Sequence, residues 1–82
     1  MNLYNVSVKN EGQYCFVFAE SKPSAISMFA KKNGSTDDLA GCRANLLAKN
    51  VGGKSCVINN YEHPGYLRVV TLGFRYEGGE VY

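Results

Sequence analysis

The start of the chain holds two segments in which large apolar residues recur at every second position, and this pattern is typical of a β-hairpin. Apolar side chains recur at every second position in residues 3–9 and again in residues 13–19. The residues between them, Asn10-Glu11-Gly12, fit a three-residue loop with Gly12 in the left-handed conformation, whereas a two-residue loop would set aromatic side chains opposite polar ones. The longer loop predicts one apolar face, with Cys15 on the other. Its cross-strand pairs are Val8 with Tyr14, Val6 with Phe16 and Tyr4 with Phe18.

The next segment predicts an amphipathic helix that packs on this apolar face. Ser21 is a good N-cap residue, and Pro23 is tolerated in the first turn. Asn33-Gly34 predicts the end of the helix, after two lysines that suit the negative end of the helix dipole. The apolar stripe consists of Ile26, Phe29 and Ala30.

The middle of the chain allows two interpretations. Residues 35–50 either form a helix interrupted at Gly41, or form one turn followed by a strand over residues 42–49. In the second case a turn at Gly52-Gly53 leads to another strand over residues 55–59. We favour this second hairpin, because it pairs two strand edges that would otherwise be exposed.

The last third also allows two interpretations. Residues 66–76 form either a helix that stops at Gly73, with Phe74 folding back, or a strand that uses the Val-Val-Thr run. With 82 residues, the chain is expected to form a single domain over residues 1–82. The predicted fold class is therefore α+β: an antiparallel sheet of an N-terminal hairpin plus a second hairpin, packed against one main helix, with either a C-terminal helix or a fifth strand.

Charge and cysteine content exclude several classes of protein. Nine Lys and Arg against seven Asp and Glu give a net charge of +2, without the concentrated basic stripe of a duplex-DNA binder. The apolar runs are far too short to span a membrane, and the N-terminus lacks a secretory signal. The three cysteines are odd in number, so they cannot all pair within one chain, which fits a reducing, cytoplasmic location.

The motifs argue against catalysis. Residues 48–55 come close to a phosphate-binding loop, but Ala48 replaces the first glycine and a strand follows where that motif needs a helix. A Gly-Gly turn beside Lys54 and Ser55 can still hold one phosphate through backbone N–H groups. Cys56 and His63 are suitable types for nucleophilic catalysis, but so small a domain rarely forms the necessary pocket. No C-x-x-C element is present. We therefore expect no enzyme activity, no cofactor and no metal.

The order of strand, Gly12 turn, strand and helix start, with Ser21-x-x-Ser24-Ala25-Ile26 opening the helix, resembles many short phage and mobile-element proteins. Some of these inhibit bacterial defence, including anti-CRISPR proteins that block an effector and sponges that sequester a nucleotide signal. The resemblance implies an anti-defence inhibitor in the host-cell cytoplasm and assigns no residue a role.

These observations predict a small non-enzymatic binding protein. We expect a homo-oligomer, because one small core leaves little net stability. As an inhibitor it would block a protein partner, with tyrosines and Arg68 as anchors. As an alternative it would sequester an anionic nucleotide, with lysines and Arg68 on the phosphate and Tyr61 stacking on the base; a third alternative is a nucleic-acid-binding module. The expected binding residues are Lys49, Lys54, Ser55, Tyr61, His63, Tyr66, Arg68 and Tyr76.

Overall fold

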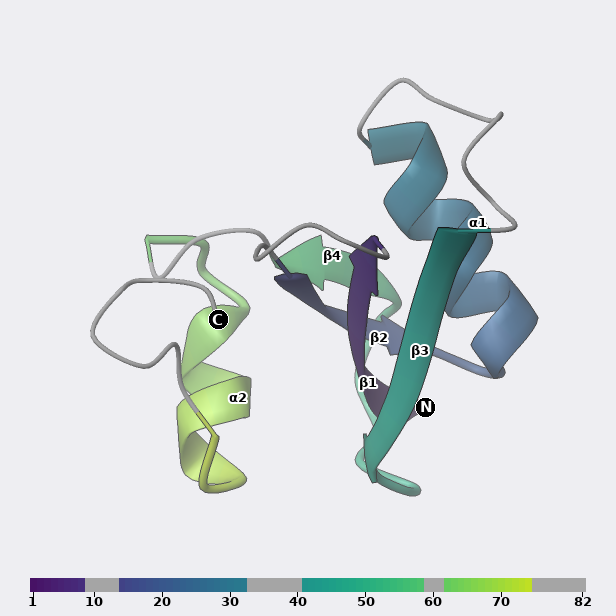
Figure 1. Ribbon diagram of the computed structural model, residues 1–82. Coiled ribbons are helices and arrows are strands. Elements are labelled where there is room, and N and C mark those ends of the chain that lie inside the picture. The colour runs from purple at the N-terminus through teal and green to yellow at the C-terminus, as the bar shows by residue number, and fades with distance from the viewer. Residues whose placement is uncertain (9–13, 33–40, 59–61, 75–82) are drawn as a thin grey trace.

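A four-stranded antiparallel sheet organises the protein, with one helix on each of its faces (Figure 1). The computed structural model describes residues 1–8, 14–32, 41–58 and 62–74. The predicted fold class, α+β with one main helix, is confirmed, and the C-terminal segment forms a second, short helix. The strand order in the sheet is β3-β1-β2-β4. The elements are β1 (Asn2–Val8), β2 (Tyr14–Ala19), α1 (Lys22–Lys32), β3 (Cys42–Ala48), β4 (Cys56–Ile58) and α2 (Tyr66–Thr71).

The expectation that β3 and β4 form a second hairpin is wrong. β3 pairs with β1 and β4 pairs with β2, so the two strands lie at opposite edges of the sheet. The predicted turn at Gly52-Gly53 exists, but it belongs to a connection between the two edges. In this arrangement each added strand covers an edge that the N-terminal hairpin alone would leave exposed.

The register of the N-terminal hairpin also differs from the prediction. Val6 lies opposite Cys15, Tyr4 opposite Val17 and Leu3 opposite Phe18. The predicted pairs Val8–Tyr14, Val6–Phe16 and Tyr4–Phe18 are therefore wrong, and Tyr14 lies opposite Ser7. Cys15 does not point away from the core but is buried on the same face as Val6. The loop from which the register was inferred lies outside the described residues.

The physical reason is that both faces of the central strands are buried. Residues 15–19 form an uninterrupted apolar run, which is what a strand covered on both sides requires. Tyr4, Val6, Cys15 and Val17 pack beneath α1 together with Ala25 and Phe29. The opposite face carries Leu3, Phe16, Phe18 and Ile58, covered by Val69 of α2. The prediction assumed that only one face of the hairpin is covered, whereas α2 covers the second face as well.

Local signals agree with the start of α1 and the end of α2, while Asn33-Gly34, the predicted end of α1, lies outside the described residues. The Ser21 hydroxyl accepts a hydrogen bond from the backbone N–H of Ser24 at 3.3 Å, so Ser21 caps α1 as expected. After α2, Gly73 has a φ of 96°, and its N–H donates to the carbonyl of Val70 at 2.9 Å. The N–H of Phe74 donates to the carbonyl of Val69 at 3.1 Å, which completes a Schellman motif. Phe74 folds back onto the α2 side of the sheet, which agrees with the helical one of the two alternatives for residues 66–76.

Candidate functional site

The guanidinium of Arg68 holds the connection between β3 and β4 against the body of the protein. Nη1 donates to the carbonyl of Lys54 at 3.3 Å, and Nη2 donates to the carbonyl of Gly52. The guanidinium carbon lies 3.8 Å from the centroid of the Phe18 ring, within the range of a cation–π interaction. Arg68, predicted to contact a phosphate or a partner, thus makes these three contacts within its own chain.

The backbone of this connection depends on left-handed conformations at Asn50, Gly52 and Gly53, with φ of 54°, 70° and 80°. Two further hydrogen bonds tie it to the start of β1. The N–H of Val51 donates to the carbonyl of Met1 at 2.8 Å, and the N–H of Asn50 donates to the side-chain oxygen of Asn2 at 3.1 Å. The connection is therefore anchored at both its middle and its start.

The other residues predicted to bind a ligand are dispersed. Lys49, Lys54 and Ser55 are exposed on the connection between β3 and β4. Tyr66, at the start of α2, is partly buried against the α2 face of the sheet, with its ring centroid 6.4 Å from that of Phe16. Tyr61 and Tyr76 lie outside the described residues.

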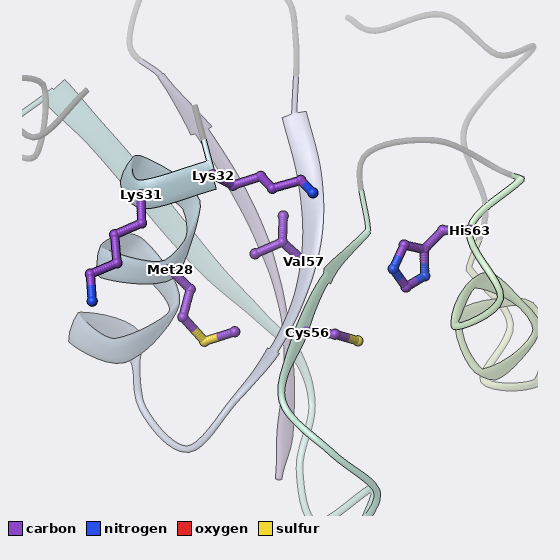
Figure 2. Close-up of a pocket in the computed structure, with 6 residues that line it drawn as sticks. All are labelled: Met28, Lys31, Lys32, Cys56, Val57 and His63. Atoms are coloured by element: carbon purple, nitrogen blue, oxygen red, sulfur yellow. The ribbon is translucent and has the colours of Figure 1, made fainter. Parts of the chain in front are cut away.

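A groove runs along the outer side of β4, with a volume of about 440 Å³ (Figure 2). The last turns of α1 lie on one side of β4 and the segment that leads to α2 lies on the other, so the groove crosses the edge strand. The lining residues are Met28, Lys31, Lys32, Cys56, Val57 and His63. Of these, His63 was predicted from the sequence as a binding residue.

Both lysines of the groove were missed as binding residues. In the sequence Lys31 and Lys32 are explained by the dipole of α1, because cations at a helix C-terminus are favourable. Their sequence neighbours contain no signal for a binding site. Only the tertiary structure, in which β4 lies at an edge of the sheet, brings them to the same groove as His63.

The orientation of His63 is determined by its own loop. Its Nδ1 accepts a hydrogen bond from the N–H of Gly65 at 2.9 Å. In the neutral ring the proton is therefore on Nε2, which becomes a hydrogen-bond donor. Figure 2 shows the ring directed from its loop toward β4. His63 can thus donate a hydrogen bond into the groove without first being protonated.

Cys56 lines the same groove but is a weak nucleophile. Burial raises the pKa of its thiol, and the nearby positive charge of Arg68 offsets this only in part. The thiol stays protonated at neutral pH, and the thiolate is the reactive form. Burial beneath α1 also raises the pKa of the Cys15 thiol, to about 11, although the positive charge of Lys32 acts to lower it. Over residues 1–8, 14–32, 41–58 and 62–74, no group of His, Cys, Asp or Glu side chains is arranged to hold a metal ion.

A second surface of note lies on the outer side of α2. Leu67 is 74% exposed, Val70 is 44% exposed, and Leu72, just after the helix, is 37% exposed. Single exposed apolar residues are ordinary, but three within six positions of one short helix form a local apolar surface. We call Leu67, Val70 and Leu72 the outer α2 surface.

Comparisons of the chain with protein-family models, with curated proteins and with solved structures give no match. In the part of the chain that the structure describes, no helix has the length and apolar character needed to cross a membrane.

Proposed function

We propose that the protein is a small non-enzymatic binding protein that holds an anionic ligand in the groove along β4. The observation that carries this proposal is that Lys31, Lys32 and His63 line one groove. Two ammonium groups and one imidazole N–H are hydrogen-bond donors, and the described residues that line the groove include no carboxylate to compete for them. A negatively charged group is the natural complement of this donor set.

The apolar part of the groove narrows the class of ligand. Met28 and Val57 contribute an apolar surface beside the donors, and Met adapts its shape easily to flat partners. A ligand that joins a phosphate to a base or another planar group would use both parts. This favours the nucleotide-sequestering function, with the phosphate at Lys31 and Lys32 rather than at Lys49, Lys54 and Ser55.

The resemblance of the opening segment to phage proteins would make that ligand a nucleotide signal of bacterial defence. Sequestration needs no chemistry on the ligand, which agrees with the protonated thiol of Cys56. The protein would then act in the host-cell cytoplasm, and its strength as an inhibitor would depend on its affinity and its copy number.

Replacing both groove lysines with alanine, Lys31→Ala with Lys32→Ala, is expected to weaken anion binding at least tenfold, since charged hydrogen bonds contribute about 1.5–3 kcal/mol each. The measurement is isothermal titration calorimetry on the full chain with ATP, a cyclic dinucleotide and inorganic tripolyphosphate. Tripolyphosphate reports the phosphate contacts alone, and tighter binding of the nucleotides would reveal use of the apolar part.

The matched control is Lys54→Ala, which removes one positive charge from the connection that the sequence indicated as a phosphate site. It should leave the affinity within about twofold, because Lys54 is exposed and does not line the groove. If Lys54→Ala weakens binding and the groove variant does not, the phosphate site lies on the glycine turn instead. If the wild-type chain binds none of the three anions, the proposed function is wrong.

A second function, blocking a protein partner, is favoured by the outer α2 surface. Exposed leucine and valine side chains that lie close together are typical of surfaces that bind another protein. Leu67→Asp is expected to abolish capture of such a partner by the tagged protein, while Ser27→Asp, an exposed change on α1, should not. The measurement is quantitative mass spectrometry of captured host proteins, and a partner held equally by both variants would contradict this role of α2.

A further inference from the structure

The two edges of the sheet differ sharply in length and charge. β4 has three residues, Lys31 and Lys32 line the groove next to it, and Lys54 lies shortly before it in the sequence. A short edge strand surrounded by lysines is a common protection against pairing with another chain. β3 has seven residues, and Arg43 is its one charged side chain. Among the described segments, no strand pairs with the outer edge of β3.

A β-bulge limits the part of β3 that can accept another strand. Tyr4 lies opposite Leu46 and Leu3 lies opposite Ala48, so Leu47 is an extra residue on β3. A bulge bends the strand and interrupts its regular pattern of backbone groups. The regular stretch of β3 is therefore residues 42–46, which pair without a break with β1.

This stretch is complementary to itself. In antiparallel pairing around a two-fold axis at Ala44, Arg43 lies opposite Asn45 of the second copy, and Cys42 lies opposite Leu46 of the second copy. Opposite residues in an antiparallel pair point to the same face, so these side chains contact each other. The axis passes through alanine, whose small side chain is well covered on the α1 face. Leu46, which is 39% exposed, gains an apolar neighbour.

The neighbouring symmetric registers are worse. An axis at Arg43 would place two arginines opposite each other, and like charges in that position destabilise a sheet. An axis at Asn45 would require the bulged residue Leu47 to pair regularly. Ala44 is thus the position that uses the whole regular stretch without opposing charges.

We propose that β3 pairs with β3 of a second copy of this chain, antiparallel and with the two-fold axis at Ala44, to form one sheet that continues through both copies. This interface is independent of the groove along β4, because the two lie at opposite edges of the sheet. Loss of anion binding would therefore leave the proposal standing, and loss of the dimer would leave the groove intact.

The test is sedimentation equilibrium on the full chain over a range of concentrations, with two changes at one exposed position. The wild-type chain should approach twice its mass of 9.0 kDa. Asn45→Lys places a second positive charge opposite Arg43 in each of the two symmetric pairs, and should raise the dimer Kd by roughly tenfold. Asn45→Glu places a carboxylate there instead, and should lower the dimer Kd by a roughly similar factor.

Because Asn45→Glu is expected to strengthen association, an unfolded variant cannot imitate the result. Ser27→Lys and Ser27→Glu, exposed changes of the same charge on α1, should leave the dimer Kd unchanged. A wild-type chain that stays monomeric at high micromolar concentration overturns the proposal, and so does a dimer that responds to neither change at Asn45. An axis at Asn45 would oppose like charges in both variants, so weakening by both also overturns it.

Discussion

Replacing Arg68 with alanine is expected to lower the free energy of unfolding by about 2 kcal/mol, since it removes two charge-assisted hydrogen bonds and one cation–π contact from a partly buried position. The carbonyls of Gly52 and Lys54 lose their protein donor, and the Phe18 ring loses the guanidinium that covers it. Urea unfolding followed by circular dichroism measures the change.

Two controls separate the guanidinium from its charge. Arg68→Lys keeps the positive charge but cannot reach both carbonyls from one planar group, so it should recover less than half of the lost stability. Lys54→Ala removes an exposed side chain but keeps the backbone carbonyl that Arg68 contacts, so it should change stability by less than about 0.5 kcal/mol. An Arg68→Ala protein as stable as wild type would show that the contacts of Arg68 contribute nothing to folding.

Gly53→Ala is expected to destabilise the protein by about 2 kcal/mol or more, for two reasons that add. Gly53 has a φ of 80°, a conformation that costs a residue with a Cβ about 1–2 kcal/mol. A Cβ at this position would also overlap the guanidinium of Arg68, so the guanidinium would have to move away from the carbonyls of Gly52 and Lys54. The measurement is again urea unfolding, with the slope of the transition checked for a change in the unfolded state.

Gly52→Ala is the matched control for this prediction. Its φ of 70° is similar, but a Cβ there would meet no atom within 4 Å. It should therefore carry the backbone cost alone, about 1 kcal/mol. In an Arg68→Ala background the cost of Gly53→Ala should fall to that of Gly52→Ala, because the overlapping group is gone. Equal costs for the two glycines in the wild-type background would contradict the overlap with Arg68.

The parts of the fold that were predicted correctly depend on neighbours in the sequence. Ser21 caps α1 because a hydroxyl one residue before a helix reaches an N–H of its first turn. Gly73 ends α2 because a left-handed residue can close the last turn, and Phe74 then returns to the sheet. The glycine turn after β3 was also predicted, since two adjacent glycines favour positive φ.

The binding surface could not be predicted in the same way. His63 was a candidate from the sequence, but the lysines that line the same groove come from α1, some thirty residues earlier. Arg68 was predicted to bind a ligand because arginine is common at binding sites. In the structure its guanidinium binds carbonyls on the connection between β3 and β4, and no pattern in the neighbouring sequence indicates such a contact.

The sequence by itself determined the fold class, the start of α1 at Ser21 and the existence of the N-terminal hairpin, and it left residues 66–76 open between a helix and a strand. Each of these follows from hydrogen bonds and φ angles within a few residues. The tertiary structure alone decided the register of that hairpin, the placement of β3 and β4 at opposite edges, and the groove. These depend on which faces of β1 and β2 become covered, and Val69 of α2 covers the second face from the far end of the chain. Burial is a property of the assembled layers, so alternation within one strand could not reveal it.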